Sequence, residues 1–140
     1  MKRLVLDTNI LSELMRAVPN PAVLAWLDAQ QADELYITAI TQAEILLGLS
    51  VLPDGRRKSS LFAAATAMFV EDFALRCLPF DDSAAQAYAS LVTMCRAAGR
   101  PISMADAQIA AIAVVWQATL VTRNVKDFSN VPLALTNPWD

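Results

Sequence analysis

The sequence predicts a three-layer α/β/α fold, in which a central, mainly parallel sheet of four to five strands carries helices on both faces. Short apolar stretches typical of buried strands recur along the chain. Segments with helical spacing of apolar residues separate them, and strands separated by helices pair in parallel. The third observation is composition. The chain has 140 residues, 56% hydrophobic and 18% charged, which suits a single domain over residues 1–140.

The first predicted strand and helix flank an acid. Residues 2–6 contain a short apolar run and form the first expected strand, which ends at Asp7. Ile10, Leu11 and Leu14 then follow with helical spacing, so a helix is expected directly after Asp7.

A second helix is expected from Pro21, because proline is favoured in the first turn of a helix. Residues 34–38 predict the next strand. A third helix is expected over about residues 43–51, and it must stop before the Pro53-Asp54-Gly55 turn.

The middle of the chain predicts a fourth helix over residues 58–73 and a short strand over 77–80. Pro79 cannot donate a ladder hydrogen bond, so this strand is expected at an edge of the sheet. A further helix is expected after Asp81, and it ends at Gly99.

The last long helix is expected to begin at Ser103. Residues 119–122, with Leu120 and Val121 between two threonines, predict a further buried strand, and residues 133–136 predict a final short one.

Composition narrows the possible chemistry. The sequence contains no histidine and only two cysteines, so the usual structural zinc sites and histidine-based catalysis are excluded. Oxygen ligands alone select hard ions such as Mg²⁺ or Mn²⁺. The longest apolar run, residues 109–116, is too short to span a membrane, so we expect a cytoplasmic protein without a membrane partner. The net charge of −3 argues weakly against a polyanionic partner.

Three acids occupy similar local positions: Asp7, Glu44 and Asp106 each follow a strand or loop where a helix is expected to start. Strand ends and helix starts meet at one edge of an open α/β sheet, where such folds bind ligands. Like charges there oppose each other's ionisation unless a cation neutralises them. The pattern therefore makes these acids candidate metal ligands.

Helix capping is the competing interpretation of the same acids. Thr41 with Glu44, and Ser103 with Asp106, both fit the spacing of a capping box. Asp7 is placed to cap the helix after the first strand. A cap and a metal ligand are compatible roles, because a helix N-terminus favours the ionised carboxylate.

Four motifs follow one another along the chain: Leu6-Asp7-Thr8-Asn9-Ile10-Leu11-Ser12-Glu13-Leu14, Ala43-Glu44-Ile45-Leu46-Leu47-Gly48, Ala105-Asp106-Ala107-Gln108-Ile109-Ala110-Ala111 and Leu120-Val121-Thr122-Arg123-Asn124-Val125-Lys126-Asp127-Phe128. In this order they resemble the PIN-domain ribonucleases, and most closely the VapC and FitB-type toxins of toxin–antitoxin pairs. The resemblance extends over nearly the whole chain. The terminal Asn137-Pro138-Trp139 belongs to the same resemblance.

The resemblance implies a PIN-like fold and a Mg²⁺-dependent endoribonuclease, in which Mn²⁺ can substitute. Asp7 and Asp106 then match metal ligands, and Glu44 matches a ligand that binds directly or through water and orients the attacking water. Cleavage would leave a 5′-phosphate and a 3′-hydroxyl.

The resemblance also implies partners. The expected ones are an RNA substrate, a cognate antitoxin, a second copy of the chain in a homodimer, and operator DNA reached only through the antitoxin complex. Exposed arginines at the rim of the site are expected to choose the RNA target. The candidates are Arg56, Arg57, Arg100 and Arg123.

Five further polar residues match positions around the acids. Thr8, Asn9 and Thr122 correspond to residues that hold the acids in place, and Thr122 is expected to donate its hydroxyl to Asp7. Asn124 stands where the family often has a fourth acid, which removes one negative charge. Asp127 either replaces part of that charge or serves as a loop or capping aspartate.

Two other functions stay open at this point. Asn124 and the net negative charge are compatible with a catalytically weak or inactive PIN module that acts by binding protein. A metal-dependent phosphohydrolase of small molecules is the third hypothesis. It is disfavoured because the chain has only three glycines and none of the glycine-rich phosphate-binding motifs.

Overall fold

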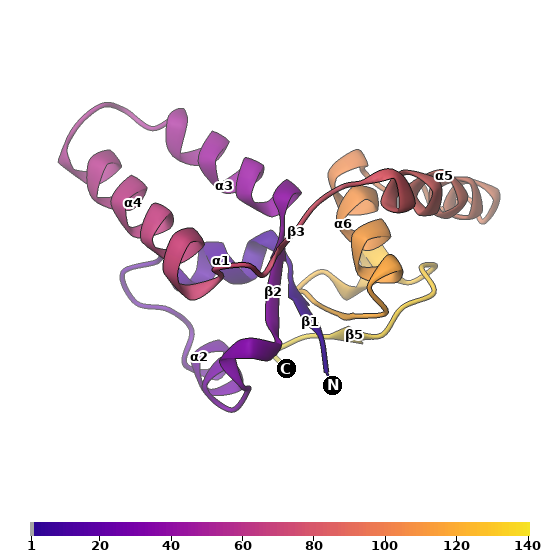
Figure 1. Cartoon of the computed structure of the whole chain (residues 1–140), viewed down its shortest axis with the longest axis horizontal. Coiled ribbons are helices and arrows are strands. Elements are labelled where there is room, and N and C mark those ends of the chain that lie inside the picture. Colours follow the sequence, from indigo (N-terminus) through magenta and orange to yellow (C-terminus); the bar gives the residue numbers. More distant parts are fainter. Residues whose placement is uncertain (1) are drawn as a thin grey trace.

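The computed structural model describes residues 2–140 and has a five-stranded sheet at its centre (Figure 1). The strands are β1 (Leu4–Leu6), β2 (Leu35–Thr38), β3 (Cys77–Leu78), β4 (Thr119–Val121) and β5 (Leu135–Thr136). They lie in the order β3-β2-β1-β4-β5, and every neighbouring pair is parallel. The predicted parallel sheet is thus confirmed, and β3 is an edge strand as Pro79 indicated.

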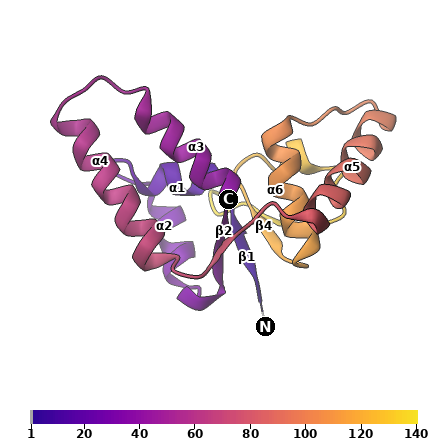
Figure 2. The same cartoon turned by 45° about the horizontal axis from the view of Figure 1, so that its top comes forward.

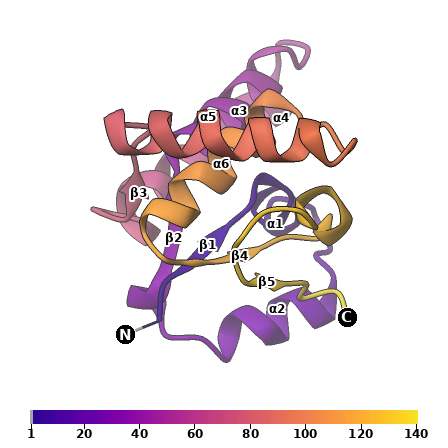
Figure 3. The same ribbon diagram turned by 90° about the vertical axis from the view of Figure 1, so that its right-hand side faces the viewer.

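Helices cover both faces of the sheet. They are α1 (Thr8–Leu14), α2 (Pro21–Asp28), α3 (Ala39–Ser50), α4 (Arg56–Ala67), α5 (Asp82–Ala97) and α6 (Met104–Val115). α5 and α6 lie on one face and α1 to α4 on the other, as Figures 2 and 3 show. The three-layer α/β/α prediction is therefore confirmed. Within residues 2–140, no helix is long and apolar enough to cross a membrane.

Alternation along the strands divides the core into two clusters. Val5 points to the face that carries α5 and α6, while Leu4 and Leu6 point to the face of α1 to α4. Leu120 and Val121 of the neighbouring strand alternate in the same way. β1 and β4 therefore each pack against helices on both faces of the sheet.

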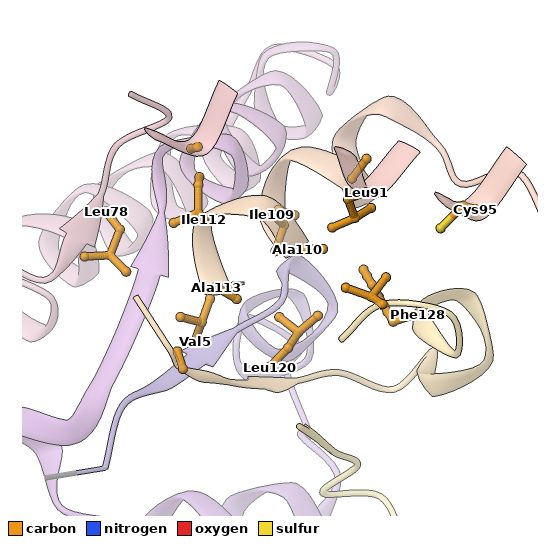
Figure 4. Packing of buried hydrophobic residues seen from close by; sticks show 14 residues of the cluster. Val5, Leu78, Leu91, Cys95, Ile109, Ala110, Ile112, Ala113, Leu120 and Phe128 are labelled. Atoms are coloured by element: carbon orange, nitrogen blue, oxygen red, sulfur yellow. The ribbon is translucent and has the colours of Figure 1, made fainter. Parts of the chain in front are cut away.

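The cluster under α6 is closely filled (Figure 4). Ile109, Ile112 and Ala113 of α6 lie over the sheet, and Phe128 closes the cluster from the short turn η3 (Val125–Phe128). Every residue of α6 from Ile109 to Ala113 is buried, and three of them are alanines. These small side chains let α5 and the sheet approach α6 from opposite sides.

Two predicted helix bounds are corrected by the structure. The third helix begins at Ala39 rather than near residue 43, because Thr38 caps it: the Thr38 hydroxyl accepts the Thr41 N–H at 3.1 Å. The fourth helix is regular only over Arg56–Ala67 and continues as a π-helical turn, η2 (Met68–Asp72). A 3₁₀ turn, η1 (Ala32–Glu34), precedes β2.

Candidate active site

The sequence-predicted acids Asp7, Glu44 and Asp106 line one cleft of about 580 Å³. Asp7 follows β1, Asp106 lies in the first turn of α6, and Glu44 projects from α3. The cleft therefore lies at the carboxyl edge of the parallel sheet, where strand ends and helix starts meet.

Asp7 is the most enclosed of the three acids, with 4% of its surface exposed. Its carboxylate accepts the Thr8 N–H at 2.8 Å, so Asp7 caps α1 as predicted. It also accepts the Thr122 hydroxyl at 2.7 Å and the Asn9 amide at 3.3 Å. The predicted contact from Thr122 is thus present, and three donors fix the orientation of the Asp7 carboxylate.

Burial raises the pKa of Asp7 above its ordinary value, and the hydrogen bonds from Thr122 and Thr8 oppose this only in part. The Glu44 charge raises the pKa of Asp7 further. Burial also raises the pKa of Asp106, followed by the charge of Asp7. Neighbouring carboxylates therefore disfavour the ionised form of both acids, which is the electrostatic situation that a bound cation would relieve.

Ser103 caps α6 as predicted, since its hydroxyl accepts the Asp106 N–H at 3.2 Å. The second predicted capping box, Thr41 with Glu44, is wrong. Thr41 lies inside α3 and is fully buried, because the helix starts earlier at the Thr38 cap. Glu44 is therefore one turn too far along α3 to cap it.

Glu44 is instead held by a row of hydroxyl groups. Thr8 donates to Glu44 Oε1 at 2.6 Å, and the Thr8 hydroxyl lies 3.0 Å from that of Thr41. The row continues to Thr38 at 3.5 Å, at the end of β2. Glu44 is exposed to the cleft while this row orients one of its oxygens.

The three acids line the same cleft, but their carboxylates do not converge on a single position. Among residues 2–140, no group of three or more Asp, Glu or Cys side chains has the spacing to hold a metal ion as it stands. The donor set of the cleft nevertheless consists of carboxylate, amide and hydroxyl oxygens, which fits a hard divalent cation rather than zinc or copper.

Asn124 and Asp127 have different positions. Asn124 lines the cleft, is exposed, and donates its backbone N–H to the Thr122 hydroxyl at 3.1 Å. Asp127 lies on η3 outside the lining of the cleft, although its charge contributes to the raised pKa of Asp106. Asp127 is thus close enough to influence the site electrostatically.

Sequence reasoning missed an acid that lines the same cleft, Glu13. Glu13 is buried, pairs with Arg16 at 3.1 Å and accepts the Asn20 N–H at 2.9 Å. The Asn20 N–H and then Arg16 lower the pKa of Glu13. The i, i+3 spacing of Glu13 and Arg16 was the sequence signal that indicates such a pair.

A second cavity of about 800 Å³ adjoins the cleft between α1, α3 and α4. Thr8, Ser12, Arg16 and Glu44 line both cavities. We call it the α1/α3/α4 groove. Its apolar lining is Met15, Ala17, Val18, Ile45, Leu49 and Leu61.

Comparison with known proteins gives one consistent relationship. Residues 4–133 match the family model of the PIN domain. VapC ribonuclease Y4jK of Sinorhizobium fredii is 41% identical over 137 residues, which cover 98% of each chain. Toxin FitB of Neisseria gonorrhoeae is 38% identical over 136 residues, 97% of this chain and 98% of that protein. A solved structure of FitAB bound to an IR36 DNA fragment superposes with a TM-score of 0.93 at 38% identity, covering 98% of this chain and 96% of that one.

Proposed function

The chain belongs to the PIN-domain family, and we propose that it is an endoribonuclease toxin that hydrolyses RNA phosphodiester bonds and is inhibited by a cognate antitoxin. The observation that carries this proposal is the position of Asp7, Glu44 and Asp106 on one cleft at the carboxyl edge of the sheet. The named ribonuclease and toxin relatives, which match over nearly the whole chain, support the activity.

We infer that Asp7 and Asp106 hold a Mg²⁺ ion, for which Mn²⁺ can substitute, and that Glu44 contacts it directly or through water. When bound, the ion would neutralise the acids and polarise a phosphate oxygen. Thr122, Thr8 and Asn9 hold the Asp7 carboxylate in a fixed orientation. These three hydrogen bonds would orient Asp7 as a metal ligand.

Glu44 is the proposed base. Its carboxylate is exposed to the cleft, and Thr8 donates its hydrogen bond to Oε1. Oε2 is therefore the oxygen that we propose orients a water molecule and takes up its proton. The proton passes from the water to Glu44 as the water oxygen bonds to phosphorus, the bond from phosphorus to the 3′-oxygen breaks, and the departing 3′-oxygen takes a proton from solvent water. The products are a 5′-phosphate and a 3′-hydroxyl.

The test is cleavage of a labelled RNA by the purified chain in Mg²⁺ and in EDTA. We expect cleavage in Mg²⁺ only, and loss of cleavage in Asp106→Asn. Asp82→Asn is the matched control, because Asp82 is also an acid in the first turn of a helix but lies on α5, outside the cleft. Equal cleavage by Asp106→Asn and the control would overturn the assignment.

One observation favours a second candidate function, a weak or inactive PIN module that acts by binding protein. Asn124 supplies a neutral amide where the family often has an acid, so the cleft has one negative charge fewer. A folded chain that cleaves no RNA and still binds its antitoxin would support this candidate.

The antitoxin is proposed to occupy the α1/α3/α4 groove. The groove has an apolar lining and opens beside the acidic cleft, so an amphipathic helix bound there would also cover the RNA site. Val18, which is 80% exposed, lies at this groove and is available to a partner. Leu49 of α3 and Leu61 of α4 contribute to the apolar lining of the groove.

Co-purification of the chain with a co-expressed candidate antitoxin tests the groove. Val18→Asp is expected to abolish the complex. Val70→Asp is the matched control, since Val70 is 67% exposed but lies on η2 and does not line the groove. Equal recovery of the partner by both variants would exclude the groove as the binding site.

We also propose that the chain pairs as a homodimer and reaches operator DNA only through the antitoxin complex. The similarity to FitAB bound to DNA supports this arrangement. Light scattering of the purified chain measures the homodimer, and electrophoretic shift of operator DNA measures the second claim. Operator binding by the chain alone would contradict it.

A further inference from the structure

One arginine at the rim of the cleft lies on an aromatic ring. The guanidinium carbon of Arg123 is 5.0 Å from the centre of the Trp139 ring. Arg123 follows β4, Trp139 follows β5, and both line the cleft that contains Asp7 and Asp106. The parallel pairing of β4 and β5 brings these two strand ends together.

Hydrogen bonds hold both members of this pair in place. The backbone N–H of Arg123 donates to Asn9 Oδ1 at 3.3 Å, and Asn137 Nδ2 donates to the backbone carbonyl of Arg123 at 3.3 Å. Asn137 Oδ1 accepts the Trp139 N–H at 2.9 Å, so a single amide side chain joins the two backbones. Trp139 is half-buried and packs against the core cluster of α1 to α4. The pair is therefore organised before any ligand binds.

A second arginine, Arg3, also lies over a tryptophan ring, that of Trp116. The Arg3 guanidinium lies 5.4 Å from the centre of the Trp116 ring and donates to the Trp116 carbonyl at 2.9 Å. Arg3 thus uses its donors within the fold. In residues 2–140, the Arg123 guanidinium donates no hydrogen bond, and the two ion pairs are Arg16–Glu13 and Lys58–Asp54. Arg123 is exposed, so its planar group is available to a ligand in the cleft.

We propose that Arg123 is an RNA-binding residue that stacks its guanidinium plane on a nucleobase beside the cleaved phosphodiester, and that Trp139 is its positioning residue. This inference rests on the proposed ribonuclease function. A guanidinium supported by a ring on one side presents its other face to a base, and single-stranded RNA is recognised in this way by planar groups. The positive charge also offsets the repulsion between RNA and a cleft lined by four carboxylates.

The experiment measures fluorescence anisotropy with a labelled oligoadenosine and with an equally long abasic ribose-phosphate chain. Ca²⁺ replaces Mg²⁺, and a gel checks that the RNA stays intact. The full chain is compared with Arg123→Lys, Trp139→Phe and Trp139→Leu. Arg96→Lys is the matched control, because Arg96 is exposed on α5 and outside the cleft.

The full chain is expected to bind the oligoadenosine about tenfold more tightly than the abasic chain, the usual effect of one stacked base. Arg123→Lys keeps the charge but not the plane, so this preference should fall to about twofold or less while salt dependence persists. Trp139→Phe should keep the preference, and Trp139→Leu should lose it although circular dichroism shows a folded chain. Arg96→Lys should behave like the unmodified chain.

A preference that survives in Arg123→Lys would overturn the proposal, because charge alone would then explain the binding. Absence of any preference in the unmodified chain would also overturn it. Cleavage in Mg²⁺ is measured in parallel and separates the two proposals. Cleavage without base preference would support the ribonuclease function and contradict stacking by Arg123. Base preference through Arg123 without cleavage would support stacking and contradict the ribonuclease function.

Discussion

The carboxylates of Asp7 and Glu13 are almost equally enclosed in the cleft, but their pKa values are shifted in opposite directions. Asp7 is 4% exposed and Glu13 is 5% exposed. Burial raises the pKa of Asp7, whereas the Asn20 N–H and Arg16 lower the pKa of Glu13. Glu13 has a cationic partner within the chain, whereas the charge that shifts the pKa of Asp7 is the like charge of Glu44.

This difference distinguishes Glu13, which has a structural role, from Asp7, which we propose to be a metal ligand. The Glu13 region is electrostatically complete, because its carboxylate, Arg16 and the Asn20 N–H satisfy one another. Among residues 2–140, neither Asp7 nor Asp106 forms an ion pair, and the charge of a neighbouring carboxylate raises the pKa of each. Such uncompensated acids reduce stability and are typical of sites that bind a cation.

Asp7→Asn is expected to reduce RNA cleavage by about 10³-fold or more, because it removes a charged ligand that three donors hold in place. Glu13→Gln should change cleavage by less than about threefold, since this acid is already paired. Single-turnover cleavage of a labelled RNA measures both. Similar losses in the two variants would remove the distinction between the two acids.

Thr122→Val is expected to reduce cleavage about tenfold by freeing the Asp7 carboxylate from one of its orienting donors. Thr122 is fully buried, so loss of its hydroxyl should also cost about 1 kcal/mol of unfolding free energy. Cleavage assays and urea denaturation check the two effects. Thr122→Ser, which keeps the hydroxyl, is the control and should restore most of the activity.

Glu13→Gln should lower the melting temperature at neutral pH, because the ionised Glu13 carboxylate is stabilised by Asn20 and Arg16. A lowered folded-state pKa contributes stability that is present above the ordinary value of 4.5 and is lost as the pH falls through the lowered value. The difference between variant and unmodified chain should therefore shrink on acidification. Thermal melts from neutral to acidic pH measure it.

Asp106→Asn should have the opposite and smallest effect, a rise of about 1–3 °C in melting temperature in EDTA at neutral pH. Burial and the Asp7 charge raise the pKa of Asp106, so its contribution is full below the ordinary value of 3.8 and is lost as the pH rises through the raised value. The advantage of the variant should therefore grow with pH. A variant that is less stable than the unmodified chain at neutral pH would contradict the proposed electrostatic cost.

The sheet order of the fold was not predicted, but the sequence was sufficient for the element types. Contiguous apolar residues such as Leu4–Leu6 and Thr119–Val121 were predictable strands, because buried parallel strands lack polar alternation. The start of α3 was misplaced, since Thr38 and Thr41 both have hydroxyls that can cap a helix. Only the backbone distinguishes the residue that caps α3 from the one buried within it.

The site was predictable where it depends on strand ends and unpredictable where it depends on side-chain geometry. The contact of Thr122 with Asp7 follows from the pairing of β1 with β4. The contact of the Arg123 guanidinium with the Trp139 ring depends on how residues 137–140 return to the cleft, which no local pattern encodes. The i, i+3 spacing of Glu13 and Arg16 indicates that they can pair, but it does not indicate that the pair lines the cleft.

Calorimetric titration with Mn²⁺ tests the central claim most directly, that Asp7, Glu44 and Asp106 form a metal site. We predict saturable binding by the unmodified chain and by Asp82→Asn, whose acid lies outside the cleft. Asp7→Asn and Asp106→Asn, checked by circular dichroism for folding, should weaken binding by about 10-fold or more. Equal Mn²⁺ binding by all four proteins, or no binding by the unmodified chain, would contradict the proposed metal site.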